Sequence, residues 1–196
     1  FQDVLGHCET PHSDNENRNA NLRKACELLD GTILQPGQEL SYNQALGERT
    51  KEKGWLPAPA YSGTKLVDSP GGGICQVSST LYLASVYAEM TIVERRNHGY
   101  PVSYIPLGMD ATVSWGFTDL KIRNDSPLPV KIHAEESDGY VRVSILGTET
   151  RDYDIEMSYT VGGRYVRTYM SKIDKKTGEL ISKEPYALSG YIDDIY

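Results

Sequence analysis

The chain has no long hydrophobic run, no block of basic residues and few cysteines, and each absence narrows what the protein can be. No apolar run is long enough to cross a bilayer, and no charged-then-apolar leader is present. The 27 acidic and 20 basic side chains give a net charge of −7, and the longest basic block is the pair Arg95 and Arg96. This balance argues against a nucleic acid partner. We expect no membrane span in this sequence. If the protein is exported, its targeting segment has been removed, and a membrane anchor elsewhere in a longer protein stays open.

The cysteine content predicts neither a disulfide framework nor a zinc site. Three cysteines cannot all pair within one chain, and no Cys-x-x-Cys spacing is present. Cys8 lies near His7 and His12, but this spacing matches no standard metal site, and we expect residues 1–18 to form a flexible leading arm. No metal or cofactor is therefore expected.

Hydrophobic periodicity predicts two main helices, and the second begins just after a run of glycines. The first helix ends near Gly31 and places its apolar residues at i, i+3, i+4 and i+7: Leu22, Ala25, Cys26 and Leu29. The second continues to about Met90 and has one apolar face: Val77, Leu81, Ala84 and Ala88. Cys26 is therefore expected in the core.

Alternating and β-branched segments predict many short strands, and the 14 tyrosines beside two phenylalanines agree with a β-rich protein. The turn at 35–38 is expected to join two of these strands, and Asp138-Gly139 to close a hairpin. The expected strands cover residues 32–34, 39–42, 91–94, 112–115, 120–122, 130–134, 140–146, 165–173 and 179–182. We predict a β-rich α+β fold, with one domain over residues 19–150 and a β-ribbon appendage over 151–196.

The segment from Gly71 to Ser78 places Cys75 in the first turn of the second helix. Unpaired amides at a helix start favour a thiolate and lower the pKa of a cysteine there. Glycines also let a substrate approach the backbone, so Gly72, Gly73 and Ile74 are candidate oxyanion or substrate-binding residues. The alternative is an ordinary glycine turn with a core cysteine.

A nucleophilic cysteine needs a base, and His98 is the histidine placed in a loop suited to that role. Asp110 is the nearest carboxylate past the next expected strand and could orient the base, as Asn97 could instead. Arg49 and Arg95 are candidates for binding a substrate carboxylate, or else ordinary surface ion pairs. Sequence separation does not tell whether these groups meet.

Several independent blocks in this order resemble the VanW family of bacterial proteins, first noted beside glycopeptide-resistance genes. The resemblance covers about two thirds of the chain, and the tail beyond Asp152 matches loosely the β-ribbons that often follow such domains. The matching blocks are residues 19–31, 36–37, 40–43, 47–50, 71–82, 92–95, 98, 101–106, 108, 110–112 and 120–122. Tyr104 lies within one of them and joins the expected substrate-binding residues.

The resemblance implies a function in the cell wall, outside the cell, with peptidoglycan stem peptides as the partner. Some family members look like catalytic domains of L,D-transpeptidases, which would make Cys75 the nucleophile, His98 the base and Asp110 the orienting acid. The expected reaction forms a 3-3 cross-link through a thioester, and water as acceptor would give an L,D-carboxypeptidase instead. A cysteine wall endopeptidase or amidase, and a non-catalytic wall-binding or scaffolding module, are the alternatives.

Overall fold

The computed structural model describes residues 1–195. The helices are α1 (Glu16–Leu29), α2 (Tyr42–Leu46) and α3 (Ile74–Tyr87). The strands are β1 (Asp3–Pro11), β2 (Ile33–Leu34), β3 (Glu39–Ser41), β4 (Pro57–Ser62), β5 (Lys65–Pro70), β6 (Thr91–Glu94), β7 (Lys121–Arg123), β8 (Val130–Ser137), β9 (Tyr140–Gly147), β10 (Tyr153–Gly162), β11 (Tyr165–Asp174) and β12 (Leu180–Gly190). The predicted β-rich α+β class is confirmed, and no helix within residues 1–195 is long and apolar enough to cross a membrane.

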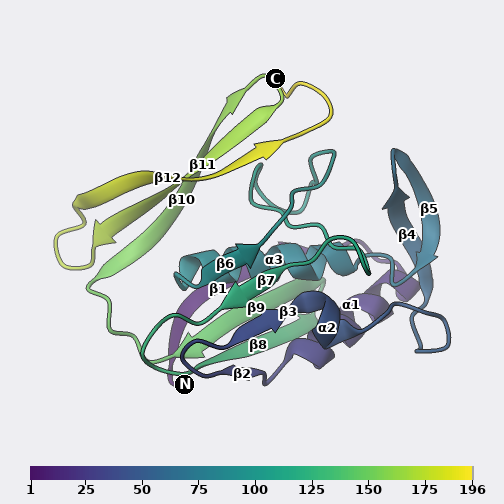
Figure 1. Cartoon of the computed structure of the whole chain (residues 1–196), viewed down its shortest axis with the longest axis horizontal. Helices are drawn as coiled ribbons and strands as arrows, with labels where there is room; N and C mark the ends of the chain where they lie inside the picture. Colours follow the sequence, from purple (N-terminus) through teal and green to yellow (C-terminus); the bar gives the residue numbers. More distant parts are fainter. Residues whose placement is uncertain (196) are drawn as a thin grey trace.

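Helix α3 lies at the centre of the molecule (Figure 1). On one side it packs against the antiparallel sheet β1-β9-β8-β2, which also carries α1. On the other side lies the smaller sheet β3-β7-β6. Twelve of its 14 residues are buried, because protein encloses the helix on nearly every face. The glycine loop and Cys75 are therefore attached to a helix that is buried along most of its length.

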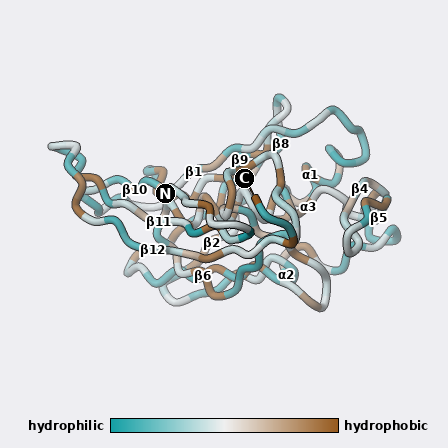
Figure 2. Tube along the Cα trace, turned by 90° about the horizontal axis from the view of Figure 1, so that it is seen from above, coloured by the Kyte–Doolittle hydropathy of each residue, from teal (hydrophilic) through white to brown (hydrophobic). Residues whose placement is uncertain are grey.

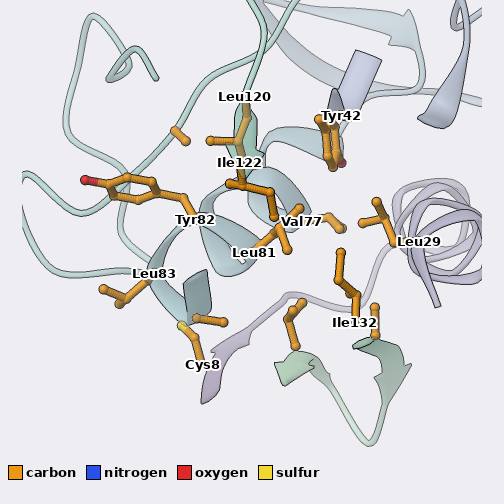
Figure 3. Packing of buried hydrophobic residues seen from close by; sticks show 14 of the residues in the cluster. Cys8, Leu29, Tyr42, Val77, Leu81, Tyr82, Leu83, Leu120, Ile122 and Ile132 are labelled. Carbon is orange, nitrogen blue, oxygen red and sulfur yellow. The ribbon is translucent and has the colours of Figure 1, made fainter. Parts of the chain in front are cut away.

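The core forms where α3 meets both sheets, as the close-up in Figure 3 shows. Val77 and Leu81 on α3 lie between Ile122 of β7 and Ile132 of β8, and each of these four side chains is fully buried. The predicted apolar stripe of α1 is confirmed. Its four residues are all at most 1 % exposed: Leu22, Ala25, Cys26 and Leu29. Asn15 caps α1 by accepting a hydrogen bond from the Arg18 amide, so the helix begins earlier than residue 19.

The expected flexible arm is wrong for residues 3–11, which form strand β1. Its partner β9 pairs along its whole length, and alternate residues of β1 face α3. Cys8 is buried while the neighbouring His7 is exposed, because successive side chains of a strand point to opposite faces. His12 instead bonds Glu136 through Nε2 at 2.9 Å, so these three residues do not converge.

Other local expectations were partly right. The hairpin at Asp138 and Gly139 is confirmed, with positive φ angles of 54° and 80° that suit a tight hairpin turn. The turn at 35–38 forms, but β2 pairs with β8 and β3 with β7, so the two strands do not pair with each other. Residues 112–115 form a tight loop with one isolated bridge rather than a strand, and the hairpin β4–β5 was not anticipated.

The C-terminal ribbon β10-β11-β12 and the hairpin β4–β5 lie at opposite ends of the molecule (Figure 2). The ribbon is anchored on the main body: Val166 and Ser189 are fully buried, and Tyr191, just beyond β12, is 2 % exposed. The expected boundaries at residues 18 and 150 stay predictions. The ribbon nevertheless shares buried surface with the domain before it, which an independent appendage would not.

Strand β1 approaches α3 so closely at Gly6 that a side chain does not fit. A Cβ atom there would lie 2.2 Å from the Ala84 carbonyl oxygen and 2.5 Å from the Ala88 nitrogen. We expect Gly6→Ala to lower the free energy of unfolding by about 1–3 kcal/mol, measured by urea denaturation, because the backbone must shift. Gly162→Ala is the control: its Cβ would meet no atom within 4 Å, and we expect a change within about 0.5 kcal/mol. Equal losses in both variants would contradict this account of the packing.

Candidate active site

A tight glycine turn delivers Cys75 to the start of α3. Gly73 precedes the helix with φ of 102°, a left-handed conformation that other residues rarely adopt. A Cβ atom on Gly72 would lie 2.1 Å from the Ala58 carbonyl oxygen in β4, so only glycine fits there. The turn brings the chain from β5 into α3 and makes Cys75 the second residue of the helix.

The Cys75 sulfur is half-buried and lies among polar groups. The Val113 amide donates to Sγ at 3.5 Å, Thr112 Oγ1 lies 3.7 Å away, and Val113 O lies at 3.4 Å. Burial by itself raises the pKa of Cys75. Hydrogen bonding and positive charge from His98, with the Val113 and Thr112 donors, outweigh burial and lower the pKa below its ordinary value. The environment therefore favours the thiolate.

His98 joins the sulfur to a buried carboxylate. Its Nδ1 lies 2.6 Å from Asp110 Oδ2, and its backbone amide donates to the same oxygen at 2.7 Å. Burial lowers the pKa of His98, but the hydrogen bonds to Asp110 and Cys75 together raise it to about 9. The opposed pKa shifts of Cys75 and His98 favour a thiolate–imidazolium pair near neutral pH. The structure thus brings the three residues together, although 23 and 12 positions separate them along the chain.

Asp110 is held by two groups besides His98. The Tyr191 hydroxyl donates to Oδ1 at 2.9 Å and accepts from the Gly108 amide at 2.9 Å, and Arg95 NH2 lies 3.7 Å from Oδ1. Burial raises the pKa of Asp110, but His98 and Arg95 hold it below the ordinary value. Tyr191 was missed by sequence reasoning, because it comes 81 positions later and no motif marks it.

Arg95 does not lie in the cleft that contains Cys75. Its guanidinium donates to the carbonyl oxygens of Asp110 at 2.7 Å and Gly108 at 3.0 Å, and its plane lies 4.9 Å from the centre of the Tyr82 ring. The side chain is therefore committed to holding the loop behind Asp110. Asn97 likewise donates to backbone carbonyls and not to the imidazole, so Asp110, not Asn97, holds the His98 ring.

Some backbone amides of the glycine turn already donate a hydrogen bond within the protein, and others do not. Those of Gly72 and Ile74 donate to the carbonyl oxygens of Ser69 at 3.0 Å and Gly71 at 3.4 Å. Those of Gly73 and Cys75 have no acceptor within residues 1–195. Of the expected oxyanion donors, Gly73 stays a candidate and the Cys75 amide joins it, whereas Gly72 is already bonded.

Cys75 and His98 open on a single cleft of about 970 Å³. Hairpin β4–β5 forms one wall and contributes Tyr61 and Leu66 to it. Residues 101–104 and 112–115 line the cleft as well, and Tyr104 is among them. Arg49, a predicted carboxylate-binding residue, lines the cleft, and so does Arg18 of α1, which sequence reasoning did not single out. The cleft is wide enough for a short peptide to reach the sulfur.

The other two thiols differ sharply from Cys75. Cys8 and Cys26 are buried among apolar side chains, and burial raises the pKa of each to about 12. No group of three potential metal-binding side chains occurs in the described part of the chain. Cys75 is thus the thiol whose surroundings suit a nucleophile.

A known protein family covers the part of the chain that contains the Cys75, His98 and Asp110 site. The family model described as VanW like protein matches residues 17–146, about two thirds of the chain. The chain belongs to the VanW family. The matched segment contains Cys75, His98 and Asp110 but ends before the ribbon and Tyr191.

Two curated relatives extend the comparison. The chain is 37 % identical over 138 residues to the Uncharacterized protein YoaR of Bacillus subtilis, covering 70 % of this chain and 46 % of that protein. It is 32 % identical over 122 residues to the Vancomycin B-type resistance protein VanW of Enterococcus faecalis, covering 60 % and 44 %. The chain thus spans about half the length of these VanW-family relatives. No solved structure matches it significantly.

The pKa directions predict selective alkylation. In the folded protein, iodoacetamide should modify Cys75 with an apparent pKa below that of a free thiol, because His98 stabilises the thiolate. Cys8 and Cys26 should stay unmodified until the protein is unfolded, since burial raises each pKa to about 12. Rates measured by mass spectrometry between pH 5 and 10 test this. His98→Ala should shift the pH profile of Cys75 alkylation to higher pH. A Cys75 that reacts as slowly as Cys26 would contradict the assignment of Cys75 as a reactive thiol.

The Tyr191 hydrogen bond predicts a link between the ribbon and Asp110. Tyr191→Phe leaves Asp110 Oδ1 and the Gly108 amide without this partner, so unfolding should become easier by about 1–3 kcal/mol. The pKa of Asp110 should rise, because a donor to its charged form is lost. Urea denaturation and a carbon-detected NMR titration measure the two effects. Tyr159→Phe, at an exposed ribbon position, is the control and should change neither.

Proposed function

We propose that this VanW-family chain is a cysteine acyltransferase of the bacterial cell wall, an L,D-transpeptidase that forms 3-3 peptidoglycan cross-links. The observation that carries the proposal is the Cys75–His98–Asp110 arrangement opening on a cleft wide enough for a peptide. The name of the Enterococcus faecalis relative, a vancomycin resistance protein, supports a role in the wall. Because peptidoglycan lies outside the membrane, the proposed site of action is extracellular.

The first stage is acylation of Cys75. The thiolate attacks the carbonyl carbon of the third residue in a donor tetrapeptide, and a carbon–sulfur bond forms. The amides of Gly73 and Cys75 then face the oxyanion, and each well-placed donor is worth about 3–4 kcal/mol. Imidazolium His98 gives its proton to the leaving nitrogen as the carbon–nitrogen bond breaks, which releases the terminal D-alanine. A thioester and a neutral imidazole remain.

The second stage returns the site to its starting state. Neutral His98 takes a proton from the side-chain amine of an acceptor stem as that amine attacks the thioester. The carbon–sulfur bond breaks, the thiolate is restored beside the imidazolium, and an amide cross-link is formed. Asp110 stays ionised throughout and stabilises the charged ring. Water in place of the amine would yield the L,D-carboxypeptidase product.

The decisive test uses defined disaccharide tetrapeptides and product analysis by mass spectrometry. Wild type should release D-alanine and form 3-3 dimers, and Cys75→Ala should lose at least about 1000-fold in rate, because the covalent route is gone. His98→Ala should lose about 100- to 10,000-fold. The matched control is Cys8→Ala, the same truncation at a buried thiol outside the cleft, and it should stay active.

The products also separate the alternatives. Stems cut at another peptide bond would indicate an endopeptidase, and stems freed from the sugar would indicate an amidase. Turnover that is equal in wild type and Cys75→Ala would remove the nucleophile assignment. Binding of the muropeptides without any turnover would support the non-catalytic module instead.

A further inference from the structure

Two half-buried arginines flank the glycine turn that carries Cys75. Arg18 comes from α1 and Arg49 from the segment after α2, and both line the cleft. A Cβ atom on Gly73 would lie 2.7 Å from Arg18 Cγ, and one on Gly71 would lie 2.7 Å from Arg49 Cγ. The two side-chain stems therefore pack directly against the turn, one at each end of it.

Neutral acceptors hold both guanidinium groups in place. Arg18 donates to Gln76 Oε1 at 2.7 Å, and the Gln76 amide is itself fixed by bonds to Thr10 and Pro11. Arg49 donates to the Gly47 carbonyl at 2.9 Å and to Asn43 Oδ1 at 2.6 Å. Its plane also lies 5.8 Å from the centre of the Trp115 ring. These hydrogen bonds orient each guanidinium group but do not neutralise its positive charge.

The nearby carboxylates do not bond to these arginines. Asp119 acts on Arg49 electrostatically, but its oxygens accept hydrogen bonds from Ser41 and from the Asn43 and Leu120 amides. Glu48 lines the cleft and is exposed, and it makes no ion pair within residues 1–195. Elsewhere the arginines of the fold are commonly paired: carboxylate oxygens lie within 4.0 Å of Arg23, Arg95, Arg123, Arg142 and Arg151.

A partly desolvated cation without a counter-charge is unfavourable unless something else supplies the negative charge. Burial lowers the pKa of both Arg18 and Arg49, which reflects this unfavourable state. Both charges also act on Cys75, so they lie within electrostatic range of the reacting sulfur. A guanidinium binds a carboxylate through two parallel hydrogen bonds, and a ligand carboxylate would provide the missing charge.

We propose that Arg18 and Arg49 form a paired carboxylate-binding site that takes a peptide with one carboxylate on each side of the carbonyl attacked by Cys75. The side-chain stems of Arg18 and Arg49 pack at opposite ends of the glycine turn, and both residues line the cleft that contains Cys75, so one ligand can contact both arginines and the sulfur. The identity of the ligand as a stem peptide rests on the proposed function. The preference of the site for carboxylates does not depend on the proposed function, and a separate experiment measures it.

The first experiment compares alkylation of Cys75 by anionic iodoacetate and neutral iodoacetamide. In each reaction the same thiolate attacks the reagent's carbon, forms a carbon–sulfur bond and displaces iodide, so the ratio of the iodoacetate rate to the iodoacetamide rate cancels the thiolate fraction. In the folded wild-type protein, the ratio of the iodoacetate rate to the iodoacetamide rate at Cys75 should exceed the same ratio measured for Cys75 in the unfolded protein. It should fall about three- to tenfold in Arg18→Gln and in Arg49→Gln, because a charge that attracts the reagent is lost.

Three further variants make this comparison decisive. Arg123→Gln removes an exposed arginine on β7 that is paired with Asp125, and it should leave the ratio unchanged. Arg18→Lys and Arg49→Lys keep the charge and should retain most of the wild-type ratio, which covers the case of a glutamine variant that does not fold. An unchanged ratio in both glutamine variants, or an equal fall in Arg123→Gln, would overturn the carboxylate site.

The second experiment uses the inert Cys75→Ala protein and a tetrapeptide stem as either the free acid or the C-terminal amide. Calorimetry should show the acid binding at least about tenfold more tightly, with the difference lost in the one of the two variants, Arg18→Gln or Arg49→Gln, that removes the arginine bound to the C-terminal carboxylate. Equal binding of acid and amide would overturn the inference while leaving the proposed function intact. Binding of neither would overturn the stem peptide as substrate, and the alkylation ratio would then decide the carboxylate site alone.

Discussion

The buried carboxylate of Asp110 is the interaction on which the rest of the site depends. It is 1 % exposed, and without donors an ion in that position would be strongly destabilising. His98, Tyr191 and Arg95 surround it; His98 and Arg95 come from the segment after β6, and Tyr191 comes from the end of the ribbon. The same contacts orient the imidazole toward Cys75 and hold the ribbon on the domain. Stability and the charge state of the thiol are therefore coupled through one side chain.

The position of α3 explains how Cys75 is held in a fixed place. The helix is enclosed by two sheets, so its first turn has little freedom, and the close approach at Gly6 adds to the constraint. Loops on the opposite side of the cleft supply His98 and Thr112. Mobile loops alone would not keep a sulfur and an imidazole aligned, whereas a buried helix and a buried ion pair do.

The cleft combines an ionised nucleophile with uncompensated positive charge. Arg18 and Arg49 favour the thiolate electrostatically and leave room for anionic groups of a ligand. The relatives in Bacillus and Enterococcus are about twice the length of the matched region, so those proteins contain further segments beyond it.

The sequence by itself determined the local features: the apolar stripe around Cys26, the glycine turn before Cys75, the hairpin at Asp138 and the candidate base His98. Each of these depends on neighbours within a few residues, where spacing and backbone propensity are informative. Strand β1, the partners of β2 and β3, and the roles of Tyr191 and Arg18 depended on long-range contacts. Only the tertiary structure decided them, because which strands pair and which charges stay unpaired follow from packing between segments far apart in the chain.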